Sequence, residues 1–296
     1  MLAAAGAALA YGLTIVQGRT LAKAHLGAPT ALGARFAIAS LGAVALLAVR
    51  RAPLVPARGE RAAVFLLGAI GYTAESTLFF MGLERGTAAA VALLFYVYPA
   101  VVTAVELAAG WAPRKGPTVI ALGLSLGGTG LVVAYGNHVA ISVTGVACAL
   151  GAAGTFAAYA LVSTRVVRAT DPLTTAAWVA GGAALSLLGR GLLTGELRSP
   201  SGHLPGLVAY GLETAVAFAL MFLALARIGA SRTSVVMTLE ALFAVVLGAA
   251  VLGETLTAGQ VVGGAAILAA TAVIALTRVG LGEPPGARAE AALPTT

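Results

Sequence analysis

The sequence predicts an all-α polytopic membrane protein with ten transmembrane helices, arranged as two inverted five-helix repeats. Three features predict it: the composition, the spacing of long apolar runs and a similarity between the two halves of the chain. Hydrophobic residues make up 59% of the 296 residues and charged residues only 10%, whereas a soluble domain is about 25% charged. So few charges cannot cover a soluble protein of this size, which excludes soluble, disordered and nucleic-acid-binding classes.

Ten apolar runs, separated by short connectors with charged residues or Pro and Gly, approach or reach the length of a membrane span. A transmembrane helix needs roughly 20 such residues. We expect helices because lipid offers the backbone no hydrogen-bond partners, and because the period-2 alternation of a strand barrel is absent from the sequence. The runs are 2–18, 29–49, 62–83, 87–111, 117–135, 143–164, 173–189, 204–226, 233–253 and 258–277.

The basic residues are divided unevenly between the two sides of the predicted bundle. If the N-terminus is inside, twelve Lys and Arg residues fall in cytoplasmic connectors and the tail, against five in the opposite connectors. This asymmetry predicts that both termini are cytoplasmic in a cell membrane, either plasma or inner. Arg19 and Lys23, which follow the first run, work against this orientation. The polar, Pro-rich tail is expected to be disordered.

The two halves of the chain share a pattern of polar residues. The third run carries Tyr72 and Glu75, and the eighth carries Tyr210 and Glu213, in the same Tyr-x-x-Glu spacing. Because a five-span unit is odd-numbered, its second copy enters the membrane in the opposite orientation, as in many secondary transporters with a midplane substrate site. The predicted division is a first repeat over 1–136, a second over 137–277 and a tail over 278–296.

Short motifs are spread along the chain to about residue 277. They are Tyr11-Gly12, Arg35-Phe36, Tyr98-Pro99, Phe156-Ala157-x-Tyr159, Leu239-Glu240-Ala241, Leu252-Gly253-Glu254 and Gln260-x-x-Gly263-Gly264. In these motifs the chain resembles the ten-helix EamA type of the drug/metabolite transporter superfamily. It departs from that pattern at Ala241, in place of a proline, at Trp111-Ala112, in place of Gly-Glu, and at Tyr11, in place of a tryptophan.

The resemblance implies export or exchange of small metabolites, often amino acids, through a central cavity. It also implies which spans enclose that cavity, namely the first, third, fourth, sixth, eighth and ninth. No nucleotide-binding, zinc-protease or dinucleotide motif occurs in the sequence. We therefore expect no enzyme activity, no cofactor and no metal site, and transport driven by a gradient or by exchange. The alternative left open is a membrane sensor or scaffold that transports nothing.

Three glutamates lie near the middle of predicted spans: Glu75, Glu213 and Glu240. A charged residue at the centre of a membrane helix costs about 2.5–3.5 kcal/mol on insertion scales, so these side chains should face the bundle interior. They are candidates for binding a substrate ammonium group or for coupling to protons, while a hydrogen-bonded structural role is the alternative. Glu75 and Glu213 are expected to approach each other across the cavity and to exchange protons for a cation.

Other candidate site residues are aromatic or basic. Tyr72, Tyr96, Tyr98 and Tyr210 combine a ring with a hydroxyl, which suits an ammonium ion by cation–π attraction, although packing is the plainer alternative. Arg35, inside the second run, is a candidate for binding a substrate carboxylate, or for pairing with a glutamate instead.

Proline and glycine in the apolar runs predict two further features. Pro99 removes a backbone donor in mid-span and should kink the fourth span, which makes it a candidate gate. The motif Gly123-x-Ser-x-Gly127 lies inside an apolar run, where it predicts a close-packing helix face instead of a nucleophile elbow. Gly259 and Gly263 predict a similar face in the tenth run.

Overall fold

The computed structural model describes residues 1–110, 116–135, 141–237 and 239–279, which form thirteen helical elements and no strand. The elements are α1 (Leu2–Lys23), α2 (Ala28–Val49), α3 (Arg61–Leu66), the π-helix η1 (Leu67–Tyr72), α4 (Thr73–Arg85), α5 (Ala88–Phe95), α6 (Tyr98–Ala108), α7 (Gly116–Tyr135), α8 (Val143–Val166), α9 (Pro172–Thr194), α10 (Leu204–Met237), α11 (Leu239–Leu252) and α12 (Ala258–Val279). Most of the expected tail and the departure at Trp111-Ala112 lie outside the described residues.

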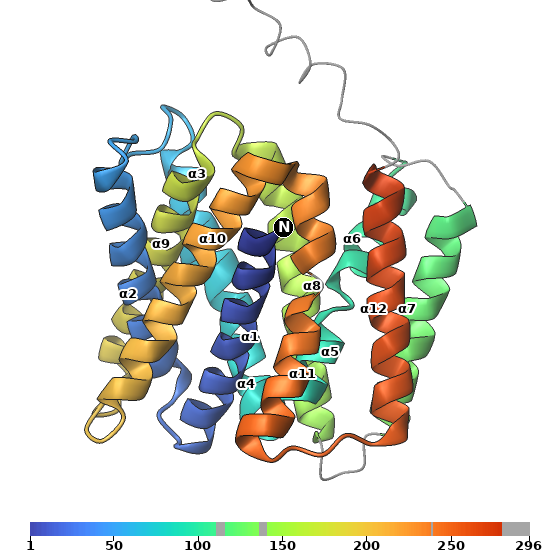
Figure 1. The fold of residues 1–296 in the computed structure, drawn as a ribbon. Coiled ribbons are helices and arrows are strands. Elements are labelled where there is room, and N and C mark those ends of the chain that lie inside the picture. The colour runs from blue at the N-terminus through green and yellow to red at the C-terminus, as the bar shows by residue number, and fades with distance from the viewer. Residues whose placement is uncertain (111–115, 136–140, 238, 280–296) are drawn as a thin grey trace, which may run out of the picture.

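The helices run between two ends of the molecule and follow the apolar runs of the sequence (Figure 1). The third span consists of α3, η1 and α4, and the fourth consists of α5 and α6. Among the described residues, six segments are long and apolar enough to cross a membrane: Ala28–Val49, Arg61–Arg85, Ala88–Ala108, Val143–Val166, Pro172–Thr194 and Leu204–Met221. Shorter apolar stretches are Val119–Val132, Leu239–Leu252 and Ala258–Val273.

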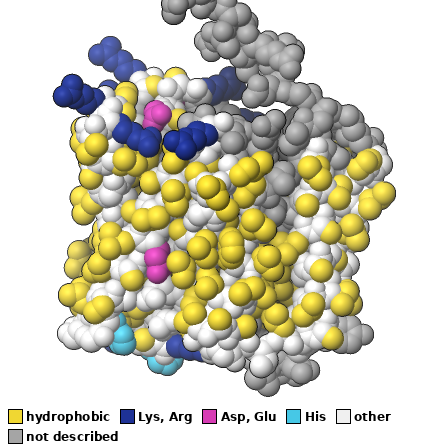
Figure 2. Space-filling model, viewed as in Figure 1, with side chains coloured by type: hydrophobic (Ala, Val, Ile, Leu, Met, Phe, Trp, Pro, Cys, Tyr) yellow, Lys and Arg dark blue, Asp and Glu magenta, His cyan; other side chains and the backbone are white. Residues whose placement is uncertain are grey.

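Large apolar side chains face outward over the middle of the bundle. Leu41, Ile70, Leu126, Leu185 and Val251 are each at least 63% exposed, and Figure 2 shows such side chains spread over one whole face. A soluble monomer rarely exposes a contiguous apolar patch above a few hundred Å². Together with the apolar helices, this surface confirms the predicted all-α polytopic membrane fold.

Contacts between the two halves of the bundle occur in matching pairs. Helix α1 packs against α10 and α11, and α8 packs in the same way against α4 and the two helices of the fourth span. Similarly, α2 contacts α10 while α9 contacts η1. The pairs α2–α9 and α7–α12 each join the equivalent helices of the two halves. This is the contact pattern of two five-span units related by a twofold axis.

Two spans differ from the simple pattern predicted. The fourth span is broken at Tyr96 and Val97, and Pro99, which was expected to kink the span, lies in the first turn of its second part. The expected connector at 227–232 is instead part of α10, which continues to Met237 and turns over toward α11 in Figure 1. Because no Pro interrupts this stretch, a helix can continue through it, and tertiary packing decides that it does.

One packing prediction is wrong by a single residue. No described residue lies within 4 Å of a Cβ built on Gly123 or Gly127, so neither makes a close helix contact in the described part of the chain. The close approach of α7 and α12 is made by Gly128 and Gly263, where a Cβ on Gly128 would lie 2.6 Å from the Gly263 carbonyl oxygen. Glycine spacing predicted a close-packing face, but the rotation of the helix selects a different glycine.

The connectors gather at two ends of the bundle, which we name after one carboxylate at each. The Glu60 end holds connectors 50–60 and 167–171, and the Glu254 end holds connectors 24–27, 195–203 and 253–257 (Figure 1). In Figure 2 the basic side chains gather mainly at the Glu60 end. The exposed basic residues there include Arg50, Arg51, Arg58, Arg61, Arg165 and Arg168.

Glu60 joins the two connectors of its end. Its Oε1 accepts hydrogen bonds from the amides of Arg168 and Ala169, both at 2.9 Å. Its Oε2 accepts from the Thr170 amide at 3.0 Å and from the Thr170 hydroxyl at 2.6 Å. The hydroxyl of Thr170 and these amides hold the pKa of Glu60 at about 2, below its ordinary value of 4.5. A link between the two halves therefore depends on an ionised carboxylate.

Acidification is expected to release this link. Because the pKa of Glu60 is lower in the folded protein, its stabilising contribution is complete above pH 4.5 and is lost as the pH falls toward 2. Hydrogen exchange of the amides of residues 168–170, corrected for intrinsic rates, should lose protection over this range. Glu60→Ala should remove the protection at every pH, whereas Glu84→Ala, at an exposed ion pair, should change nothing. Equal protection in the Glu60 variant would contradict the assignment.

Candidate functional site

A cavity of about 940 Å³ lies inside the bundle, within the range of pockets that hold drug-sized molecules. Side chains from both halves of the chain line it. Eight of the nine side chains that the sequence singled out are among them: Arg35, Tyr72, Glu75, Tyr96, Tyr98, Pro99, Tyr210 and Glu240. The structure thus brings together residues that lie more than 200 positions apart in the sequence.

The cavity opens at the Glu60 end of the molecule. Its lining reaches the exposed residues Thr164, Arg168 and Pro172, at and beside the connector between α8 and α9. Toward the Glu254 end, all eight side chains of α5 and the side chain of Leu83 are buried. No described residue of the connectors at that end lines the cavity. The cavity is therefore a one-sided vestibule with an apolar floor.

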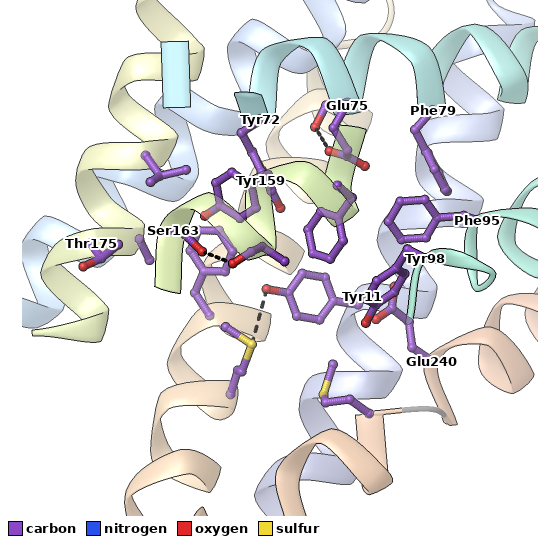
Figure 3. Close-up of a pocket in the computed structure, with 18 of the residues that line it drawn as sticks. Tyr11, Tyr72, Glu75, Phe79, Phe95, Tyr98, Tyr159, Ser163, Thr175 and Glu240 are labelled. Carbon is purple, nitrogen blue, oxygen red and sulfur yellow. Dashed lines mark hydrogen bonds between the residues drawn. The ribbon is translucent and has the colours of Figure 1, made fainter. Parts of the chain in front are cut away.

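Two carboxylates project into the vestibule on different sides of an aromatic cluster (Figure 3). Glu75, on α4, is 7% exposed and accepts a hydrogen bond at 2.7 Å from the Ser76 hydroxyl. The π-helix η1 directly precedes α4, and π-helical turns are frequent at functional sites. Glu240, in the first turn of α11, lies beside Tyr96. Each half of the chain thus supplies one acid.

Aromatic rings form a continuous series along the vestibule wall. The ring centroids are 5.5 Å apart for Tyr72 and Tyr159, 5.7 Å for Tyr159 and Phe156, and 4.7 Å for Phe156 and Tyr98. These separations are typical of favourable aromatic pairs. Phe156 and Tyr159 appear in the sequence as parts of a family motif, but nothing in their local sequence assigned them to the site. The sequence feature that could have identified them as site residues is the presence of two aromatic side chains close together inside an apolar run.

Tyr11 was likewise not assigned to the site, although its hydroxyl carries a hydrogen bond to the sulfur of Met221 at 4.0 Å inside the vestibule. Figure 3 places the Tyr11 ring between the aromatic cluster and Glu240. Helix α1, which packs against α10 and α11, brings this tyrosine to the site. The first span therefore contributes a polar aromatic group to the same wall.

Arg35 is partly buried against α10, and its guanidinium contacts two α10 side chains. Its Nε donates to the Thr214 hydroxyl at 2.8 Å and its Nη1 donates to the Tyr210 hydroxyl at 3.1 Å. The guanidinium carbon also lies 4.7 Å from the centroid of the Tyr210 ring and 5.1 Å from that of Phe36. These contacts are cation–π interactions that hold the positive charge in place. Arg35 thus ties the second span to the eighth at the edge of the vestibule.

Glu213 does not take the predicted place opposite Glu75, since it is absent from the side chains that line the vestibule. It is partly exposed, and its Oε2 is buried without a hydrogen-bond partner. In an α-helix, a residue three positions on is rotated by about 60° from the first. Tyr210 faces Arg35, and this rotation turns Glu213 away from the cavity. Glu240 is the second acid of the vestibule instead.

The break in the fourth span lies at the vestibule wall. Val97 ends the first part of the span, and its carbonyl accepts hydrogen bonds from Ala100 at 2.9 Å and Val101 at 3.1 Å as α6 begins. The Tyr96 hydroxyl donates to the Met237 carbonyl at 3.0 Å, where α10 ends. Pro99 cannot donate the backbone hydrogen bond that a continuous helix would need at this point. The two halves therefore meet at irregular backbone next to Glu240.

A model of the EamA-like transporter family matches residues 1–134 of this chain and again residues 143–276. No curated protein matches the chain. Sixteen chains of solved structures match it. One of them, described as "Crystal structure of protein", is 21% identical with a TM-score of 0.62, and the match covers 93% of this chain and 99% of that one. At this identity the likeness concerns the fold alone.

Proposed function

This chain belongs to the EamA-like transporter family, and from that premise we propose that it is a secondary transporter of small organic cations that works by alternating access. The vestibule is the substrate site, and protons are the coupling ion. The observation that carries the proposal is the meeting of two carboxylates from opposite halves with a series of aromatic rings in one cavity. Such an arrangement attracts an ammonium group by charge and by cation–π contact.

Amines are favoured over amino acids by the state of Arg35. A zwitterionic substrate needs a cation for its carboxylate, and Arg35 is the one basic residue inside the apolar runs. Its guanidinium is already held by Thr214 and Tyr210 and lies against two rings. Binding a carboxylate there would compete with these contacts, whereas an amine needs only the acids and rings. Amino acids are the second candidate, because Arg35 still lines the vestibule.

Proton coupling follows from placing two acids in one low-dielectric cavity. Two neighbouring carboxylates cannot both ionise there without a compensating cation. A bound ammonium group supplies that charge and displaces a proton, and release of the substrate lets the proton return. Glu75 and Glu240 fill these roles, so the cycle needs no nucleotide and no redox cofactor. Opening of the cavity to one side or the other decides where each exchange occurs.

The Glu60 end is proposed as the cytoplasmic end of the protein in the cell membrane, with both termini inside. This orientation is supported by the excess of basic residues in the connectors of the Glu60 end, because cytoplasmic loops of membrane proteins are enriched in Lys and Arg. In that orientation the vestibule is open to the cytoplasm, the side from which an exporter takes up its substrate. The chain divides into two repeats near residue 136. Because the repeats are inverted, an exchange of conformations between them would open the cavity to the other side of the membrane.

Pro99 is proposed as part of the gate, since it keeps the fourth span broken beside the substrate. Pro99→Ala restores a backbone donor and should favour a continuous helix, making the rearrangement of the wall slower. We expect transport to slow several-fold while the affinity measured by calorimetry stays within twofold. Pro205→Ala, at the exposed start of α10, is the matched control. A Pro99 variant with the wild-type transport rate would show that the break has no part in gating.

The proposal is tested by purified protein in proteoliposomes. Primary amines, quaternary ammonium ions, zwitterionic amino acids and organic anions are offered in turn, with and without an imposed pH gradient. The proposal expects flux of cations that rises with the gradient. Flux of amino acids alone would support the second candidate, and binding without any flux would support a sensor or scaffold instead.

A further inference from the structure

The Glu254 end is held together by one buried carboxylate. Glu254 lies in the connector between α11 and α12, and its side chain is only 5% exposed. Its Oε1 accepts a hydrogen bond from the amide of Ala88 at 3.0 Å, and its Oε2 accepts one from that of Ala89 at 3.3 Å. These are the first amides of α5, where a helix favours a negative charge. An acid of the second half thus caps a helix of the first.

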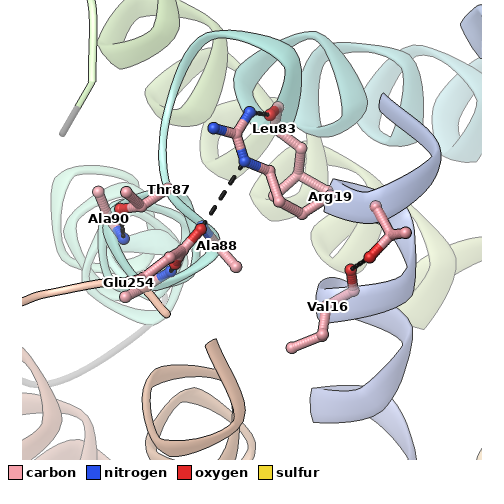
Figure 4. A network of polar contacts seen from close by, with 9 residues as sticks. Val16, Arg19, Leu83, Thr87, Ala88, Ala90 and Glu254 are labelled. Atoms are coloured by element: carbon pink, nitrogen blue, oxygen red, sulfur yellow. Dashed lines mark hydrogen bonds and ion pairs between the residues drawn. The ribbon is translucent and has the colours of Figure 1, made fainter. Parts of the chain in front are cut away.

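Arg19 connects the same carboxylate to two further helices. Its Nε lies 3.7 Å from Glu254 Oε1, and its Nη1 donates a hydrogen bond to the carbonyl of Leu83 (Figure 4). Arg19 is on α1 and Leu83 is on α4, so three segments of the first half meet one connector of the second. We name this set of contacts, between Glu254, Arg19 and the first amides of α5, the latch.

The latch lies on the outer side of the apolar floor, at the Glu254 end of the vestibule. The helix that it caps, α5, is buried along its whole length, and Leu83, whose carbonyl it holds, is fully buried. On its other side is a surface depression lined by Arg19, Lys23, His25, Glu84 and Arg85, among others. The substrate cannot leave through the Glu254 end unless α1, α4 and α5 separate from the connector. Opening of this end therefore requires that the latch break.

At the Glu60 end the sequence has no acid at the place that corresponds to Glu254, and the link through Glu60 joins two connectors while the vestibule stays open. The connector between α6 and α7 holds the corresponding place in the first half, because the fourth span corresponds to the ninth. Between Glu106 and Asp171 the sequence contains no acidic residue, and this connector carries Arg114 and Lys115 instead. A carboxylate that caps a helix of the second half cannot come from there. The two ends of an otherwise twofold arrangement thus differ in the contacts that can close them.

We infer that the Glu254–Arg19 latch is the gate of the Glu254 end and that it makes the protein rest with its vestibule open at the Glu60 end. Breaking the latch separates the Glu254 carboxylate from the α5 amides and from the largely buried Arg19, which is unfavourable until water or a bound cation compensates the separated charges. Since the Glu60 link leaves the vestibule open and no acid stands at the place that corresponds to Glu254, the substrate-free protein favours the conformation in which the latch is closed. The inference uses the alternating access of the proposed function, but not its substrate.

The test measures access to a buried position beside the latch, two residues from Arg19 on α1. Leu21 is 2% exposed, so a cysteine there, in a Cys148→Ala background, reports opening of the Glu254 end to a membrane-impermeant maleimide. Glu254→Gln is expected to raise the rate of labelling at least tenfold in the absence of substrate, and Arg19→Gln should do the same. Glu196→Gln, which removes an exposed ion pair with Arg190 at the same end, is the matched control and should leave the rate unchanged.

A second reporter separates gating from unfolding. Leu47, fully buried near the Glu60 end, should stay unlabelled as a cysteine in every variant. Wild-type labelling of the Leu21 reporter in both latch variants would overturn the inference. So would labelling of both reporters, because the contact would then hold the fold together instead of gating it. Neither result depends on transport, so the failure of the latch and that of the proposed substrate class can be told apart.

Discussion

Replacing Glu75 or Glu240 with glutamine is expected to reduce gradient-driven accumulation of an organic cation by at least about a hundredfold. Removing one partner of a buried ion pair typically costs about 3–5 kcal/mol of interaction free energy. Because each 1.4 kcal/mol corresponds to a factor of ten, this cost amounts to more than a hundredfold. Each variant keeps the shape of the side chain but cannot carry a proton or a negative charge. The measurement is the initial rate of uptake into proteoliposomes with an acidic interior.

Glu213→Gln is the matched control, because Glu213 is also a mid-span glutamate but lies outside the vestibule lining. It should transport at a rate close to that of the wild type. All three variants should insert and elute as folded protein, since glutamine keeps the packing. If Glu75→Gln and Glu240→Gln accumulate the cation at the wild-type rate, these acids are structural. If only Glu213→Gln fails, the coupling site lies at the outer face of α10.

Gly68→Ala is expected to destabilise the protein by about 1–3 kcal/mol, as overpacking of a tight contact usually does. A Cβ at this position would overlap the carbonyl oxygen of Val179 and lie 2.8 Å from its Cα. The obstacle is the backbone of α9, so no side-chain rotation can relieve it. The variant must push η1 away from α9, which would also displace Tyr72 and Glu75. A lower midpoint of thermal unfolding in detergent, with weaker transport, is the expected result.

Gly123→Ala provides the comparison, because none of the residues that the structure describes lies within 4 Å of a Cβ built there. Alanine is favoured over glycine in a helix by about 1 kcal/mol, so this variant should match or exceed the wild-type stability. If Gly68→Ala lowers the midpoint of thermal unfolding and Gly123→Ala does not, the destabilisation comes from the contact between η1 and α9 and not from the loss of glycine itself. Equal midpoints for the two variants would contradict the close approach at Gly68.

Much of the fold could be predicted from the sequence because a bilayer imposes strong rules on composition. Length and apolarity gave the spans, and Pro99 gave the interruption of the fourth. The continuation of α10 past Arg227 could not be predicted, since a lone arginine can end a span or extend a helix beyond it. Whether it does is decided by tertiary packing, which a local pattern does not contain.

The site was predictable in its residue types and less so in its geometry. Mid-span acids must avoid lipid, so Glu75 and Glu240 were identifiable, and Glu213 was equally plausible by that rule. Its position outside the vestibule depends on a helix rotation of about 60°, which the sequence does not record. Phe156 and Tyr159 were missed as site residues because an aromatic side chain in an apolar run predicts packing as readily as binding.

The most direct test of the account uses a permanently charged cation, because a weak base would accumulate passively in an acidic interior. Wild-type proteoliposomes receive radiolabelled benzyltrimethylammonium under an inside-acid gradient of one pH unit, with the membrane potential clamped at zero. One-to-one exchange for protons predicts accumulation to roughly tenfold above the outside concentration, since one pH unit is worth about 1.4 kcal/mol. A ratio equal to that of protein-free liposomes would contradict proton-coupled cation transport through this cavity.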